Sequence, residues 1–209
     1  MRSTRPATLV GLWGIPLAIL LVATGCATAP PPTGVPPADD PEAALAPGEL
    51  PLPDDARMRA YLGIQTGRSF RLADIPTDIL LVEVFDMYCP HCQREAPNVN
   101  RLYRRIAAEP SPAVRVKLIG IGIGNTAYEV GLFGKTFDVP FPLFPDRSRH
   151  YVQHLAVRQT PTFVGFVRET DGTLRRILHA PGPLGDVDLF LARLLRLADI
   201  AHHRTPPDP

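Results

Sequence analysis

The stretch MYCPHCQREAP, residues 87–97, holds two of the chain's three cysteines, Cys89 and Cys92. It follows ILLVEVFD, residues 79–86, whose nearly unbroken apolar and β-branched residues are typical of a strand buried on both faces. Over residues 99–106, apolar residues recur at helical spacing. The two cysteines are therefore expected where a buried strand ends and a helix begins.

The first 25 residues are typical of an export signal. Arg2 and Arg5 precede an apolar run that ends in small residues. Residues 21–26, LVATGC, resemble the bacterial lipobox, in which the cysteine is acylated and becomes the N-terminus. By this resemblance Cys26 carries a lipid anchor, and Ala27, which stands where aspartate would retain the protein at the inner membrane, favours the outer membrane. A retained signal anchor is the alternative interpretation.

Three further segments follow the signal. Residues 26–56 are rich in proline, which predicts an extended tether. Residues 57–200 are predicted to form one folded domain, and residues 201–209 a disordered tail. In the domain, strand-like and helix-like patterns alternate, and Asp171–Gly172 predicts a hairpin. This order predicts an α/β fold with a mixed sheet and helices on both faces.

Capping residues mark the starts of two predicted helices. Asn125 is the candidate N-cap of one helix, and Asp186 that of the last. Besides the elements already named, the expected strands cover 114–123, 141–146, 162–169 and 173–180, and the expected helices cover 125–138, 147–157 and 186–200.

Several chemistries are excluded by the residues present. The net charge is +1 without a basic stripe, so no nucleic-acid partner is expected. Two thiolates make half of a structural zinc site, and His150 and His154, four positions apart, are interpreted as surface residues rather than ligands, so no metal is predicted. Haem attachment requires histidine where Gln93 stands, and a peroxiredoxin-type peroxidase requires threonine or serine where Asp86 stands.

Thiol–disulfide chemistry fits the pair. A sulfur at a helix start lies near unpaired N–H groups and the positive end of the helix dipole, which favour the thiolate. Cys89 is therefore the predicted nucleophile and Cys92, one helical turn further on, the resolving cysteine. His91 is expected to add a donor or a positive charge, and Pro90 suits the first helical position. No cofactor is expected, because the electrons reside in the cysteine pair.

With these residues the chain resembles the thioredoxin family over roughly residues 70–200. Ala96–Pro97 follows the cysteine pair at the family's spacing, and RQTPTF, residues 158–163, matches the family's cis-proline loop. Glu83, six positions before Cys89, matches the family's buried acid. An edge strand that exposes Glu83 to water is the alternative for that residue.

The resemblance implies roles for four residues besides the two cysteines. Glu83 would assist proton transfer to or from Cys92. Pro161 would be cis and would face the cysteine pair, and the backbone of Thr160 would bind a substrate strand. Pro90 and Pro161 would complete the substrate-binding surface.

The resemblance leaves the direction of the reaction open. The connection between Cys92 and Pro161 exceeds that of a minimal thioredoxin by one strand–helix unit, which resembles the TlpA-like, redoxin-type branch of tethered proteins, many of them reductases. The dipeptide Pro90–His91 resembles that of the DsbA oxidants. The two features imply opposite directions.

The predicted function is that of a lipid-anchored thiol–disulfide oxidoreductase in the bacterial cell envelope, facing the periplasm. Its predicted partners are cell-envelope proteins that carry disulfides or dithiols, and a membrane redox partner. Two alternatives are a copper chaperone for a membrane oxidase, which would use the same cysteines, and a non-catalytic binding module with a thioredoxin fold.

Overall fold

The computed structural model describes residues 48–108 and 114–204. The predicted signal peptide, Cys26 and the tether as far as residue 47 lie outside the described residues, so these remain predictions. In the ranges that are described, every helix is too short or too polar to cross a membrane.

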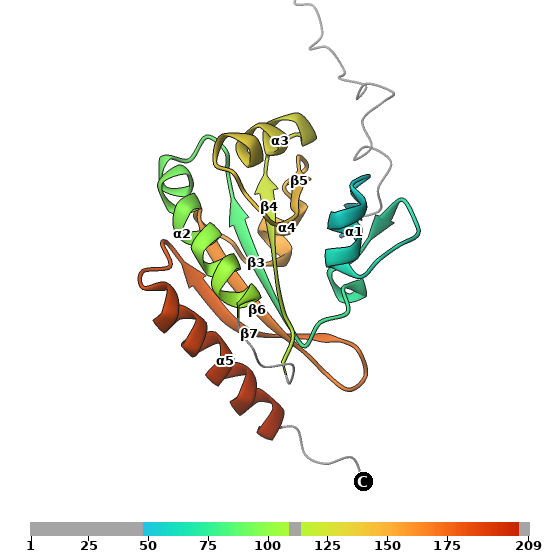
Figure 1. Ribbon diagram of the computed structural model, residues 1–209, viewed down its shortest axis with the longest axis vertical. Helices are drawn as coiled ribbons and strands as arrows, with labels where there is room; N and C mark the ends of the chain where they lie inside the picture. The colour runs from blue at the N-terminus through green and yellow to red at the C-terminus, as the bar shows by residue number, and fades with distance from the viewer. Residues whose placement is uncertain (1–47, 109–113, 205–209) are drawn as a thin grey trace, which may run out of the picture. The chain divides into compact units, whose positions relative to one another are not determined.

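A five-stranded mixed sheet forms the centre of the fold (Figure 1). Its spatial order is β5 (Leu143–Asp146), β4 (Val116–Ile123), β3 (Ile79–Phe85), β6 (Thr162–Arg168) and β7 (Leu174–Pro181). The strands β3, β4 and β5 are parallel, whereas β6 and β7 are antiparallel to their neighbours. Every residue of the central strand β3 is buried, which explains its nearly unbroken apolar sequence.

Two layers of helices cover the sheet. Because successive side chains of a strand point to opposite faces, Ile79 and Leu81 pack on one side of β3, and Leu80 and Val82 on the other. The first face carries α2 (Pro90–Ala107), α3 (Ala127–Thr136) and α5 (Val187–Arg204), and the second carries α1 (Ala56–Leu62), the 3₁₀ helix η1 (Leu72–Asp74) and α4 (His150–His154).

The predicted fold class is confirmed. The sheet is mixed, helices cover both faces, and β6 and β7 form a hairpin around Asp171–Gly172. The extra unit between Cys92 and Pro161 consists of α3 and β5, which add one parallel strand at the edge of the sheet. Pro145 belongs to this edge strand, where a residue without an N–H is tolerated.

Both predicted boundaries of the domain differ from those in the structure. The folded part begins before residue 57, because β1 (Leu50–Pro51) pairs with β2 (Ser69–Phe70), and Leu50 and Leu52 are buried in the core. The prolines of this segment predicted a tether, but burial of Leu50 and Leu52 in the core makes its last residues part of the fold. At the other end, α5 continues to Arg204, with Ala201 buried, so residues 201–204 are not part of a disordered tail.

The predicted N-cap of α3 is also corrected. Thr126, not Asn125, is the capping residue: its hydroxyl accepts from the N–H of Glu129 at 3.3 Å, and Glu129 accepts from the N–H of Thr126 at 2.7 Å. This reciprocal pair is a capping box. The side chain of Asn125 is engaged elsewhere, as described below. Asp186 does cap α5, since its carboxylate accepts from the N–H of Leu189 at 2.9 Å.

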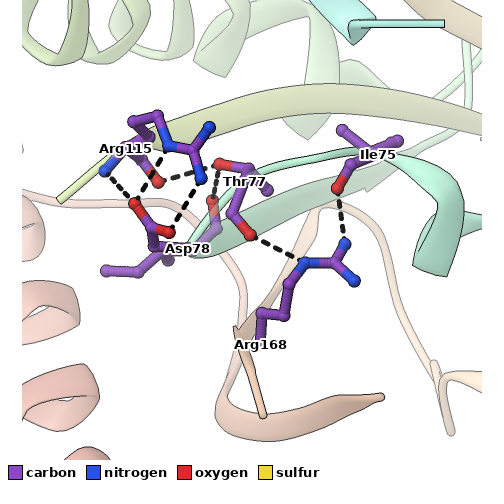
Figure 2. A network of polar contacts seen from close by, with 6 residues as sticks. Ile75, Thr77, Asp78, Arg115 and Arg168 are labelled. Atoms are coloured by element: carbon purple, nitrogen blue, oxygen red, sulfur yellow. Dashed lines mark hydrogen bonds and ion pairs between the residues drawn. The ribbon is translucent and has the colours of Figure 1, made fainter. Parts of the chain in front are cut away.

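A polar network joins the segment around η1 to the sheet (Figure 2). Arg168, in β6, donates to the carbonyl oxygens of Ile75 at 2.5 Å and Thr77 at 3.0 Å. Beside it, Asp78 accepts from the backbone and the guanidinium of Arg115, as Figure 2 shows. Arg168 also donates to the carbonyls of Ala73 and Gly172. The Arg168 guanidinium therefore donates to four carbonyls, three in residues 73–77 and one in the turn between β6 and β7.

Candidate active site

Cys89 stands at the end of the turn that follows β3, and it is the N-cap residue of α2. Its backbone N–H donates to the carbonyl of Asp86 at 3.0 Å, which closes the turn. Pro90 occupies the first helical position, as predicted. Cys89 is half-buried and Cys92 is fully buried, and both are free thiols in this structure.

The loop that contains Pro161 lies against Cys89. The Thr160–Pro161 peptide bond is cis, as the resemblance implied, and Pro161 is buried. The thiol of Cys89 donates to the carbonyl oxygen of Thr160 at 3.4 Å. On the far side of the loop, the N–H of Gly182 donates to the carbonyl of Pro161 at 2.8 Å. The fold thus brings Thr160 and Pro161 to the nucleophile across a long stretch of sequence.

The two thiols have opposite electrostatic surroundings. Burial alone would raise the pKa of Cys89, but hydrogen bonds from the Thr160 side chain and from the backbone N–H groups of Cys92 and His91 lower it below the ordinary value. Burial raises the pKa of Cys92 to about 12. At neutral pH, Cys89 is therefore the thiol that ionises more readily.

Glu83 lies within β3 and is only 1% exposed, so the alternative of an exposed edge strand is wrong. Its Oε1 is buried and has no hydrogen-bond partner within the described residues. Burial, and in second place the nearby charge of Glu95, raise the pKa of Glu83 to about 8. The carboxyl group is consequently protonated at neutral pH and can both release and accept a proton near that pH.

His91 is exposed and turned toward the next turn of α2. Its Nδ1 is 3.0 Å from Nη2 of Arg94. A guanidinium can only donate, so Nδ1 of His91 is the acceptor in this contact. Among the surroundings of Cys89, the backbone N–H of His91 supports the thiolate directly. A role of the His91 side chain in tuning the pair remains a prediction.

Two buried polar residues at the site were not recognised from the sequence. Glu95 is 6% exposed and accepts from the N–H of Leu184 at 3.0 Å, which links α2 to the loop before α5. Its position three residues after Cys92, on the same face of a helix, was the available signal. Asn125 was recognised only as a helix cap, although its side chain contacts the turn before Cys89.

The described residues contain no group of three or more His, Cys, Asp or Glu side chains placed to hold a metal ion. His150 and His154 do lie together, with ring centroids 5.9 Å apart in a stacked arrangement. They belong to α4, on the face of the sheet opposite to α2.

A Cys-X-X-Cys pair that opens a helix after a central strand, opposite a cis-proline loop, is the arrangement of a thioredoxin-like protein. The chain belongs to the AhpC/TSA family, whose model matches residues 55–177. This span is more than half of the chain and includes Cys89, Cys92 and Pro161.

Among curated proteins, the chain is similar to proteins named thiol-disulfide oxidoreductase ResA. The protein from Geobacillus thermodenitrificans is 25% identical over 112 residues, which cover 54% of this chain and 60% of the relative. The protein from Geobacillus kaustophilus is 23% identical over 125 residues, covering 60% and 68%. The chain therefore spans about three fifths of the length of the first relative.

Among solved structures, the chain is similar to MTB dsbF, described in mixed oxidised and reduced forms. The TM-score is 0.50 at 18% identity, and the match covers 63% of this chain and 89% of the other. At this identity the likeness shows the fold alone, and it agrees with the thioredoxin-like arrangement of the sheet and helices.

Proposed function

We propose that this protein is a thiol–disulfide oxidoreductase of the bacterial cell envelope. It faces the periplasm, is held at the membrane by lipid on Cys26, and exchanges disulfides with other envelope proteins. The names of its relatives support the reaction class. The signal-like N-terminus and its lipobox resemblance support the location, with the outer membrane favoured by Ala27.

One observation carries the proposal: the unequal pair of thiols beside Thr160. Cys89 is accessible, has a lowered pKa and touches the loop at which a partner strand would bind. Cys92 is buried and has a pKa of about 12, so it stays protonated until Cys89 has reacted. A nucleophile and a protected resolving thiol are what two-step exchange requires.

In the first step the Cys89 thiolate attacks one sulfur of the partner disulfide. The partner S–S bond breaks, a mixed disulfide with Cys89 forms, and the other partner sulfur leaves as a thiolate. The backbone of Thr160, together with Pro90 and Pro161, contacts the partner segment. This geometry holds the partner sulfur near Cys89.

In the second step Cys92 loses its proton and attacks the sulfur of Cys89. The mixed disulfide breaks, the partner leaves as a dithiol, and a Cys89–Cys92 disulfide remains. Two electrons have moved from this pair to the partner. With a pKa of about 8, Glu83 is suited to accept and release the proton of Cys92.

Repeated turnover needs a second redox partner at the membrane, which supplies electrons in the reducing direction or removes them in the reverse direction. The stabilised Cys89 thiolate favours the reduced pair and hence an oxidant. The TlpA-like scaffold with its α3–β5 unit favours a reductase. The reduction potential of the pair decides: about −120 mV for an oxidant and about −250 mV or lower for a reductase.

The test uses two variants, each with one cysteine of the pair replaced by serine, and a disulfide-containing protein substrate. Cys89→Ser is expected to abolish exchange, and Cys92→Ser is expected to trap a mixed disulfide that mass spectrometry detects. Reversible two-electron oxidation in glutathione buffers provides the potential. Continued turnover by Cys89→Ser, or the lack of any reversible transition, contradicts the proposal; tight Cu(I) binding that needs Cys92 would then favour the chaperone.

The lipid anchor has its own test. Cys26→Ser is expected to remove labelling by radioactive palmitate and to release the protein from the membrane fraction. Cys89→Ser is the matched control, because it also removes one cysteine but leaves the lipobox-like residues 21–26 unchanged. Unchanged labelling of Cys26→Ser contradicts the anchor and leaves the redox proposal in place.

A further inference from the structure

The turn Asp86–Cys89 carries the reactive sulfur from the end of β3 to the start of α2. Two hydrogen bonds lie within it: the N–H of Cys89 donates to the Asp86 carbonyl, and the N–H of Tyr88 donates to Asp86 Oδ1 at 3.0 Å. Gln93, in α2, donates to the carbonyl of Met87 at 2.8 Å. The position of Cys89 therefore depends on how firmly Asp86 and Met87 are held.

Asn125 holds both of these residues from outside the turn. It stands just beyond the end of β4 and is 1% exposed. Its Nδ2 donates to Asp86 Oδ1 at 3.1 Å, and its Oδ1 accepts from the N–H of Met87 at 2.9 Å. A side-chain amide offers a donor and an acceptor together, so both contacts need this functional group.

The packing around Asn125 fixes the orientation of its amide. The N–H of Asn125 donates to the carbonyl of Gly122 at 3.3 Å. A Cβ at Gly122 would lie 3.0 Å from Asn125 Oδ1 and 2.8 Å from a methyl group of Val130. The glycine leaves the space that the amide occupies, and Val130 of α3 packs against the same glycine. The side chain is thus enclosed while it holds the turn.

We propose that Asn125 is a positioning residue for Cys89. By holding Asp86 and Met87, it keeps the sulfur at the N-terminus of α2 and against Thr160, where the thiolate is stabilised. This inference rests on the proposed function, since it assigns Asn125 to the same site. The α3–β5 unit then does more than add an edge strand to the sheet, because the segment that leads into α3 positions Cys89.

The test measures how fast iodoacetamide alkylates Cys89 as a function of pH, in the reduced protein. Asn125→Ala is expected to move the midpoint of the profile to higher pH and to slow alkylation at pH 7 at least about threefold. Asn125→Asp keeps the volume and the acceptor for Met87, but sets a second carboxylate against Asp86. It is expected to shift in the same direction, and it serves if the alanine variant does not fold.

Asn100→Ala is the matched control. Asn100 is a buried asparagine of α2 whose amide donates to the carbonyls of Phe137 and Asp138, at the opposite end of α3. Its loss is expected to lower the melting temperature and to leave the Cys89 profile unchanged. A purely structural role of Asn125 would give the same pattern as this control.

The outcomes separate the two proposals. If the wild-type protein exchanges disulfides and both Asn125 variants keep its alkylation profile, the positioning role is overturned while the proposed function stands. If the wild-type protein exchanges no disulfide, the proposed function fails, and a shifted profile in the variants still supports the positioning of Cys89 by Asn125.

Discussion

Cys89 and Cys92 stand three positions apart, yet their pKa values are driven in opposite directions. Cys89 meets donors at the helix start and at Thr160, whereas Cys92 is enclosed by apolar side chains such as Phe85 and Phe133. α2 places the sulfur of Cys89 at its N-terminus and the sulfur of Cys92 inside the core. This asymmetry assigns the order of the two chemical steps.

The first prediction concerns selective alkylation. At pH 7 the native reduced protein is expected to take one iodoacetamide label, on Cys89, with Cys92 reacting at least about a hundredfold more slowly. The reason is the full burial of Cys92 and its pKa of about 12. Peptide mapping by mass spectrometry identifies the labelled residue, and in denaturant both should react. Comparable native rates for both thiols would contradict this assignment.

The second prediction concerns Glu83 and stability. Its pKa in the folded protein, about 8, lies above its ordinary value of 4.5, so the folded state binds the proton more tightly. The free energy of unfolding should therefore fall as the pH rises from about 4.5 to about 8. Glu83→Gln removes this loss, so between pH 4 and pH 9 it should gain up to roughly 5 kcal/mol relative to the wild type.

The measurement is urea denaturation of the reduced wild-type and Glu83→Gln proteins between pH 4 and pH 9. The difference between the two free energies should rise with pH through this window. A difference that stays constant across it would show that Glu83 is not a buried acid of raised pKa.

At the scale of elements, buried helices and strands could be predicted from the sequence, because a buried face requires apolar residues at a regular spacing. β3, α2 and the β6–β7 hairpin are of this kind. No local sequence pattern indicates a hydrogen bond between a side chain and backbone that is distant in the sequence. Asn125 looked like a helix cap for this reason, since an asparagine before a helix satisfies the local rule whether or not its amide points elsewhere.

The third prediction tests the network of Arg168 that Figure 2 shows in part. Arg168→Ala leaves four carbonyls, three of them in part-buried contacts, without their charged donor and should lower the free energy of unfolding by about 2–4 kcal/mol. Arg168→Lys should recover only a minor part, because a single ammonium cannot reach all four carbonyls in the fork geometry of a guanidinium.

Arg115→Ala is the control for this prediction. Its guanidinium is largely exposed, and its backbone contact with Asp78 survives the substitution, so its effect should be much smaller. Chemical denaturation gives the free energies, and limited proteolysis of residues 71–78 reports whether this segment loosens. An equal loss for the Arg115 and Arg168 variants would contradict the role given to Arg168.

For the whole molecule, the sequence predicted the order of the elements but placed the start of the fold too late. A short strand such as β1 contains too few residues for a periodic signal, and its prolines are equally typical of a tether. Only the long-range partners of Leu50 and Leu52, which include Phe70 in their cluster, show that this segment belongs to the core.

The fourth prediction compares a chain of residues 48–204 with one of residues 57–204. The shorter chain loses two buried leucines and Asp55, which caps α1 through the N–H of Arg57 at 2.7 Å. It should be less stable by at least about 3 kcal/mol, since burial of a leucine side chain contributes about 1.5–3 kcal/mol. Thermal and urea denaturation of the two proteins provide the comparison, and equal stability would place the segment outside the core after all.

The strand β1 also lies beside β5, the strand at the edge of the main sheet. An uncovered edge strand offers unpaired backbone groups to any similar edge that it meets, and Pro145 removes only one of the donors. Without its cover, β5 would invite a second molecule to pair with it. We therefore expect the first few residues of the fold to affect solubility, because their loss would expose the edge of the sheet to neighbouring copies at high protein concentration.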